Sequence, residues 1–321
     1  MRCYVFKAVL FFAVSGIAIG GCAQTFKAAP DARNVSPADA YAGTAPGKGR
    51  AAAGTGSPVI RAAPRTSPGT ASGNAHGRGA GGAARALDAA VAPLAREDGG
   101  HVAVAVQNLV TGKRASYSGT GEYAAASIEK ADILAARLYQ EQREGESGLS
   151  RDERQLADAM ITRSDNDAAS ALWRDAGGPA GVDAANRAFG LRETAAGNGP
   201  YWGLTETTAD DQLRLLRQLM AGGPVLKAAA QGYERDLMSD VEPSQAWGVS
   251  AAADPGTPVA LKNGWLPNPG LWVINSIGAV THRGQRMLVA VLSDDNPTEG
   301  SGIGLVEQVA RKAADAMASS R

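Results

Sequence analysis

The chain has 321 residues, in which 32 lysines and arginines balance 32 aspartates and glutamates. The zero formal net charge argues against nucleic acid as the main partner, because binding to phosphates depends on basic side chains. The apolar fraction of 44% is ordinary for a globular protein. Residues 86–321 are numerous enough to bury a substantial hydrophobic core.

The first 22 residues have the features of an export signal. Arg2 and Lys7 give a positive start, and the apolar run 8–19 that follows is too short to span a bilayer. The run ends in Ile19-Gly20-Gly21-Cys22, which resembles a bacterial lipobox, in which the cysteine is lipidated. We therefore expect an extracytoplasmic protein anchored to the cell membrane by lipid on Cys22, with a plain secretory signal as the alternative. Cys3 would leave with the signal, so no disulfide is expected.

Residues 23–85 consist mainly of Ala, Gly, Pro, Ser and Thr with scattered Arg and Lys, and show no hydrophobic periodicity. Such a segment cannot bury enough apolar surface to offset the entropy of ordering it. We predict a disordered tether between the lipid and a folded domain at 86–321. Its basic residues could favour anionic wall polymers or lipid headgroups, but a soluble spacer is the simpler interpretation.

The folded domain opens with a short helix predicted over Arg85 to Ala95, where Pro93 limits its extent. Alternating valines in His101 to Val106 are typical of a half-buried strand, and Arg114 to Ser118 can return as the second strand of a hairpin.

Helices then follow, with Thr207 or Thr208 as a cap for the last of them. The predicted helical ranges are 127–142, 154–161, 167–176, 182–189 and 209–220. Three strands rich in β-branched residues come next at 259–262, 271–280 and 287–293, and a helix at 303–317 closes the chain. This order predicts an α+β fold, with an antiparallel sheet of about five strands, a helical subdomain and helices packed on the sheet.

The first motif with chemical potential is Ser127-Ile128-Glu129-Lys130. A serine and a lysine three residues apart share one face of a helix. The hydroxyl is a poor nucleophile until a base removes its proton, and a lysine can serve as that base only if burial or a second cation lowers its pKa. Glu129 lies on a different face of the helix and is expected to pair with a neighbouring arginine.

The second motif is Ser164-Asp165-Asn166, which in its simplest interpretation is a polar loop and helix cap. In a functional interpretation, Ser164 could relay a proton to a leaving nitrogen and Asn166 could hold a substrate amide. The third motif is Lys262-Asn263-Gly264-Trp265, at the end of a predicted strand. Gly264 allows close approach of a substrate, and Lys262 could bind a substrate carboxylate. The alternative for Lys262 is an edge-strand lysine that discourages aggregation.

With these three motifs in this order, the sequence resembles the serine β-lactamases and penicillin-binding proteins, and most of all their class A branch. Asn263 stands where that family usually has threonine. The resemblance implies that Ser127 is the acylated nucleophile and Lys130 its base. It also implies that Ser164 relays protons, that Asn166, Lys262, Asn263, Gly264 and Trp265 contact the substrate, and that the backbone N–H groups of Ser127 and Trp265 hold the oxyanion.

The resemblance is weaker in the segment that would activate the deacylating water. Glu193 falls about where the family has its glutamate, but the family's Glu-x-x-x-Asn spacing is not kept, because Asn198 comes one residue late. An exposed glutamate after a helix is the alternative for Glu193. Asn263 and the bulky Trp265 could narrow or redirect the range of substrates.

We therefore expect a serine acyl-transfer hydrolase that acts on β-lactams or on D-Ala-D-Ala peptides. Class A-like β-lactamase activity is the first choice. DD-peptidase or esterase activity, a catalytically silent wall-binding lipoprotein and a solute-binding lipoprotein are the alternatives. We expect a monomer that needs no cofactor or metal, since none of His76, His101 and His282 has the spacing of a metal ligand. Four tryptophans are expected in the core or in a pocket wall, namely Trp173, Trp202, Trp247 and Trp272.

Overall fold

The computed structural model describes residues 78–97, 101–145 and 148–319. The predicted signal segment, Cys22 and the tether up to residue 77 lie outside these ranges. None of the helices within them has both the length and the apolar character that a membrane crossing requires.

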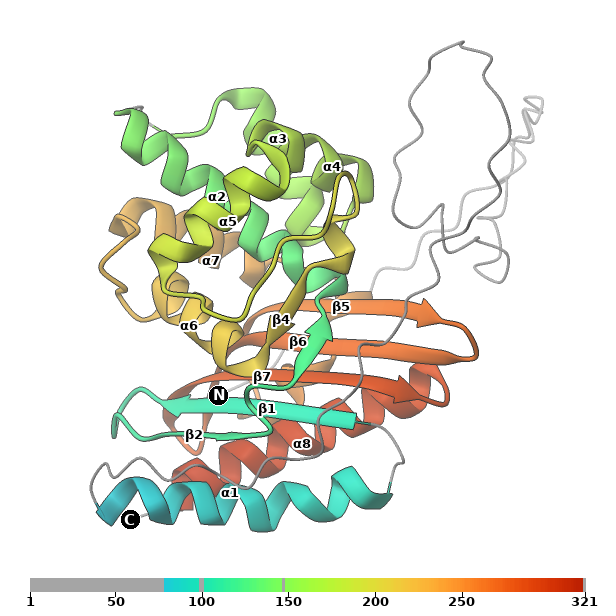
Figure 1. Cartoon of the computed structure of the whole chain (residues 1–321). Helices are drawn as coiled ribbons and strands as arrows, with labels where there is room; N and C mark the ends of the chain where they lie inside the picture. The colour runs from blue at the N-terminus through green and yellow to red at the C-terminus, as the bar shows by residue number, and fades with distance from the viewer. Residues whose placement is uncertain (1–77, 98–100, 146–147, 320–321) are drawn as a thin grey trace, which may run out of the picture. The chain divides into compact units, whose positions relative to one another are not determined.

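A five-stranded sheet lies in the middle of the domain, with helices on both of its faces (Figure 1). Its strands lie in the order β2-β1-β7-β6-β5, and each neighbouring pair is antiparallel. The register of β1 on β7 places Val104 opposite Val291, so the first strand of the domain lies in the sheet beside the last. The predicted antiparallel α+β plan is confirmed. The strands are β1 (His101–Asn108), β2 (Arg114–Tyr117), β5 (Ala260–Asn268), β6 (Leu271–His282) and β7 (Gln285–Asn296).

Helices α1 (Arg78–Glu97) and α8 (Glu299–Ser319) pack together against one face of the sheet (Figure 1). The prediction that the first helix begins at Arg85 was wrong. The helix begins at Arg78 and includes Pro93. Ala83, Leu87 and Val91 form a buried stripe along it, and their burial offsets the free-energy cost of the backbone hydrogen bond lost at Pro93.

Strand β1 is buried on both faces rather than half-buried. Val102, Val104 and Val106 belong to the core beneath α1 and α8, whereas Ala103 and Ala105 belong to the core shared with the helical block. The alternation is thus between larger and smaller apolar residues, as expected for a strand covered on both sides.

The other face of the sheet carries the helical block (Figure 1). Thr208 caps α6 by accepting the backbone N–H of Asp211, as predicted, and Ser150 and Glu153 form a capping box at the start of α3. Helix α7 and the two-stranded β3–β4 sheet were not predicted. The elements of the block are β3 (Glu122–Ala124), η2 (Ala126–Ile128), α2 (Glu129–Glu144), α3 (Arg151–Thr162), α4 (Asn166–Asp175), α5 (Gly178–Phe189), η3 (Trp202–Leu204), β4 (Glu206–Thr208), α6 (Ala209–Met220), α7 (Ala228–Ser239) and η4 (Pro243–Gln245). The short helix η5 (Gly248–Ala252) packs against α8 instead.

Candidate active site

Ser127 lies in the turn η2 that leads into α2, and its side chain is half-buried. The preceding residue, Ala126, has a positive φ of 51°, a backbone conformation that costs an alanine free energy and is held only by surrounding contacts. Such contacts come from Asn275, whose side-chain amide donates to the carbonyl oxygens of Ala124 at 2.9 Å and Ala125 at 3.0 Å. A side chain of strand β6 thus holds the backbone that leads to Ser127.

Lys130 is fully buried one turn further along α2. Its Nζ donates to the carbonyl oxygen of Ser164 at 2.6 Å, to Ser164 Oγ at 3.0 Å and to Asn166 Oδ1 at 2.7 Å. These three acceptors match the three N–H donors of an ammonium group. No hydrogen bond within the described ranges joins Lys130 Nζ to Ser127 Oγ, so proton transfer between them requires a closer approach.

The hydroxyl of Ser164 lies between two buried lysines, because Lys262 Nζ also donates to Ser164 Oγ at 3.0 Å. Ser164 itself has a φ of 57°. Asp165 fixes the loop from the other side by accepting the Ala168 N–H at the N-cap of α4, which agrees with the helix cap predicted from sequence. The first two motifs and the lysine of the third thus meet around one oxygen atom.

Burial of the two lysines changes their acidity. Burial, and after it the positive charge of Lys262, lowers the pKa of Lys130 well below that of a free lysine, against the opposing charge of Asp165. Burial also lowers the pKa of Lys262 to about 7. Once neutral, Lys130 can accept the Ser164 hydroxyl proton while Lys262 donates to the same oxygen. This is the protonation state that a base requires.

An indole ring covers Lys130. The Trp202 ring centroid lies 4.9 Å from Lys130 Nζ, and the Trp202 Nε1–H donates to Ser170 Oγ at 3.2 Å. Ser170 in turn donates to the backbone oxygen of Asn166 at 2.9 Å. Trp202, which was predicted only as a core or pocket-wall residue, is thus a wall of this site. No sequence motif marked it, because the contact depends on how the loop before β4 folds.

Gly264 brings β5 against the backbone of the turn around Ser127. A Cβ atom at this position would lie 2.8 Å from each of Ala125 O, Ser127 N and Ile128 N, so only glycine permits this approach. The structure places Gly264 and Lys262 on the face of β5 that points to the cluster.

Asn263 and Trp265 alternate to the other face of β5, and the structure does not bring their side chains to the cluster. Asn263 is 1% exposed, and its amide donates to the backbone oxygens of Gln245 at 2.7 Å and Trp247 at 3.1 Å. Trp265 is half-buried and packs against Trp247, with ring centroids 6.0 Å apart. The Asn263 side chain thus braces the backbone at Gln245 and Trp247, because side chains alternate along a strand.

The structure does not bring Glu193 to the cluster either. Its side chain is exposed, and its carboxylate accepts a hydrogen bond from Thr208 Oγ1 at 3.3 Å. Its backbone N–H donates to Asp211 at 2.7 Å. The charges that act on Lys130 are those of Lys262 and Asp165.

A group of buried carboxyl groups lies beside the site, and it corrects the expectation for Glu129. Glu129 is fully buried and pairs with no arginine within the described ranges; burial, and then the charge of Asp132, raises its pKa. Burial raises the pKa of Asp132 to about 7 and that of Glu234 well above its ordinary value. Among the residues that the structure describes, their oxygens have no hydrogen-bond partner of normal geometry. These groups therefore keep their protons to a higher pH than ordinary carboxyl groups do.

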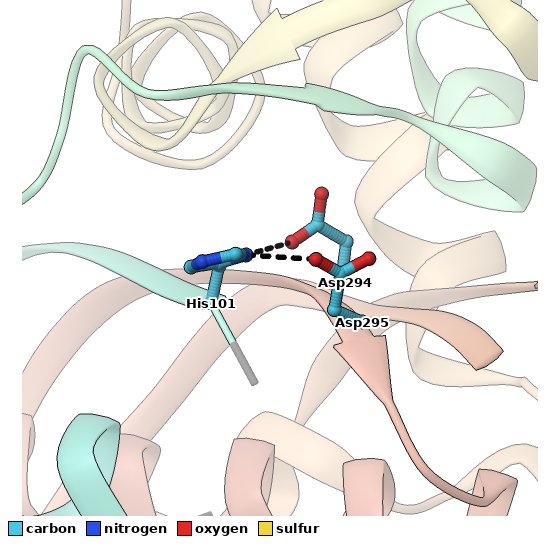
Figure 2. A group of neighbouring side chains, drawn as sticks. All are labelled: His101, Asp294 and Asp295. Atoms are coloured by element: carbon cyan, nitrogen blue, oxygen red, sulfur yellow. Dashed lines mark ion pairs between the residues drawn. The ribbon is translucent and has the colours of Figure 1, made fainter. Parts of the chain in front are cut away.

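A second cluster lies at the edge of the sheet, where His101 meets Asp294 and Asp295 (Figure 2). The His101 Nδ1 atom lies 3.3 Å from Asp294 Oδ1 and 3.0 Å from Asp295 Oδ2. All three side chains offer ligand atoms within 4.8 Å of one another. Sequence spacing did not mark His101 as a metal ligand, because its two acidic neighbours are brought to it by the register of β1 on β7. The imidazole is 54% exposed, as in a surface ion pair.

The site contains a serine at a strained helix start, a buried lysine one turn later, and a hydroxyl between two lysines. A serine acyl-transfer site needs such a nucleophile with a base beside it. The fold and these parts define a class A β-lactamase-like domain. Residues 143–317, more than half of the chain, match the model of the Beta-lactamase enzyme family. The chain belongs to this family.

A named lipoprotein is among the proteins similar to the chain. The "Putative lipoprotein LppW" of Mycobacterium bovis and Mycobacterium tuberculosis is 29% identical over 212 residues, which is 63% of this chain and 65% of that protein. The match thus spans just under two thirds of the relative's length.

Solved structures show the same fold. A β-lactamase from Chitinophaga pinensis superposes with a TM-score of 0.63 at 20% identity, over 72% of this chain and 98% of the other. A class A β-lactamase from Bacteroides cellulosilyticus gives a TM-score of 0.63 at 16% identity, over 73% and 98% of the two chains. A β-lactamase from Burkholderia phymatum gives 0.62 at 18% identity, over 73% and 99%. At these identities the likeness establishes the fold.

Proposed function

We propose that the protein is a serine acyl-transfer enzyme of the cell envelope, in which Ser127 is acylated by a β-lactam or by a D-Ala-D-Ala-type peptide. The observation that carries the proposal is the placement of Ser164 Oγ 3.0 Å from the Nζ atoms of both Lys130 and Lys262. Two buried amines around one hydroxyl favour a neutral Lys130, and a neutral amine can remove the Ser127 proton.

In the proposed reaction, Ser127 Oγ attacks the acyl carbon as its proton passes to Lys130. The bond from that carbon to the leaving nitrogen then breaks, and Ser164 relays a proton to the nitrogen. Lys262 donates to Ser164 and offers its positive charge to a substrate carboxylate. Backbone N–H groups of Ser127 and Trp265 would hold the oxyanion, and the approach of Gly264 to Ser127 N supports this arrangement. The side chain of Asn166 would also contact the substrate.

The family match favours β-lactam amides as the substrate class, with hydrolysis of the acyl-enzyme as the β-lactamase outcome. The lipobox-like sequence and the named lipoprotein relative support a protein held at the membrane outside the cytoplasm through Cys22. DD-peptidase or esterase activity is the second candidate. It is supported by Glu193, the expected deacylating base, which is exposed and bonded to Thr208.

The test is to incubate the full chain with benzylpenicillin and with a chromogenic cephalosporin, beside Ser127→Ala. Intact mass and absorbance are followed together. The expected result is a mass increase of one penicillin in wild type and none in Ser127→Ala. Rapid colour change lost in the variant would add turnover to acylation, whereas the absence of both signals in wild type would refute β-lactam recognition.

A further inference from the structure

The contacts of Trp202 bear on what happens after Ser127 has been acylated, a question that rests on the proposed function. The ring is 3% exposed, and its centroid lies 4.9 Å from Lys130 Nζ, which also donates to three acceptors. The indole is held there by the Nε1–H bond to Ser170 and, through Ser170, by the backbone of Asn166. Trp202 is therefore tied to the same loop that Lys130 contacts.

Release of the acyl group to water needs a base. The water oxygen bonds to the acyl carbon, the bond from that carbon to Ser127 Oγ breaks, and the proton lost by water is returned to Ser127 Oγ. The charged groups that shift the pKa of Lys130 are Lys262 and the exposed N-cap Asp165. Glu193, the glutamate expected as the deacylating base, is exposed, and its carboxylate accepts a hydrogen bond from Thr208. Lys130 is thus the group best placed to accept the proton from water, and the indole covers it.

We propose that Trp202 is a positioning residue that excludes water from Lys130 and so makes the acyl-enzyme on Ser127 long-lived. The ring acts on the second step and leaves the first intact, because acylation passes the Ser127 proton to Lys130 and needs no water at Lys130. Opening the space over Lys130 admits a water molecule to a base that is otherwise enclosed. A positioned general base contributes about 10²–10⁴-fold to a rate, so we expect the lifetime of the adduct to fall by at least about tenfold when the ring is removed.

The test measures the acylation rate and the adduct lifetime separately, by stopped-flow acylation and time-resolved intact mass of the full chain treated with benzylpenicillin. The variants are Trp202→Phe, Trp202→Leu and Trp202→Ala, which uncover Lys130 by increasing amounts. The series is needed because loss of a large buried side chain can itself unfold a protein. If Trp202→Ala does not fold, the comparison of Phe with Leu carries the test.

Trp173→Ala is the matched control. Trp173 is 2% exposed and donates its Nε1–H to Gly199 O at 2.9 Å, so it resembles Trp202 in burial and bonding without covering Lys130. We expect lifetimes to fall in the order Phe, Leu, Ala at position 202, with a smaller change in Trp173→Ala. The uncovered variants should also lose their adduct faster as the pH rises, as Lys130 becomes neutral.

Each other outcome overturns a defined part of the account. Equal lifetimes across the position-202 series, or an equal shortening in Trp173→Ala, would overturn the role of Trp202 while leaving acylation of Ser127 established. A wild-type adduct that is lost as fast as it forms would also overturn the role of Trp202. A wild type that forms no adduct would overturn the proposed function and this inference with it.

Discussion

Replacing Asp132 by asparagine should stabilise the protein at alkaline pH and have little effect at acid pH. Asp132 is fully buried on α2, and burial raises its pKa from 3.8 to about 7, with the charges of Asp183 and Asp211 acting in the same direction and the Asn186 amide opposing them. In the unfolded chain the carboxyl group ionises near its ordinary value, whereas in the folded chain it keeps its proton up to about pH 7. The unfolded state therefore binds fewer protons between these values, and stability falls as the pH rises through this window.

The size of the effect follows from the two pKa values. One pKa unit corresponds to about 1.4 kcal/mol, and the shift from 3.8 to about 7 gives a loss of about 4 kcal/mol above pH 7. An asparagine has a similar shape and no proton to lose. The difference in unfolding free energy between Asp132→Asn and wild type should thus become more favourable to the variant by about 3 kcal/mol from pH 4.5 to pH 8.

Urea unfolding at both pH values measures this difference directly, and the contributions of shared groups that do not interact with Asp132 cancel. Asp175→Asn, at an exposed position on α4, is the control and should show no such trend. A difference between Asp132→Asn and wild type that is the same at both pH values would refute the argument, because it would mean that Asp132 ionises alike in the folded and unfolded states.

Three further substitutions test other contacts. Gly264→Ala should reduce acylation by about 100-fold or more, since its Cβ meets backbone atoms at 2.8 Å that cannot move aside; an acylation rate within twofold of wild type would contradict this. Lys262→Met should move the acid limb of the acylation pH profile to higher pH, because loss of a positive neighbour raises the pKa of Lys130; a limb that stays in place or moves down would count against the pairing. Arg137→Met should lower the unfolding free energy by about 3 kcal/mol, because it leaves the buried carboxylate of Glu141 and the half-buried carboxylate of Glu153 without their partner; chemical denaturation that shows no loss would show these ion pairs to be dispensable.

Periodicity and β-branched composition predicted the sheet and most of the helices. The strands around Val104 and Val291 and the helix capped by Thr208 lie where the sequence indicated, because each is set by local pattern. The start of α1 was missed since its glycines and alanines resemble the tether, and only packing against α8 makes them helical. Helix α7 has a weak apolar pattern and is likewise held by its neighbours.

The candidate site could be predicted only where short motifs carry it. Ser127, Lys130, Ser164 and Lys262 were found from spacing, and the structure brings the last three around one hydroxyl. Asn263 was misjudged because its direction depends on which face of β5 it occupies. Trp202 and Asn275 were not assigned to the site, because each reaches it from a distant part of the chain.

The central claim is that Ser127 is the acylated nucleophile, and peptide-level mass spectrometry of the penicillin-treated full chain tests it most directly. The account predicts that the added mass is found on the peptide containing Ser127 and is localised to that residue by fragmentation. It also predicts that Lys130→Ala slows the labelling strongly without moving it elsewhere. A label on another residue, or labelling of Ser127 at the same rate in Lys130→Ala, would contradict the account.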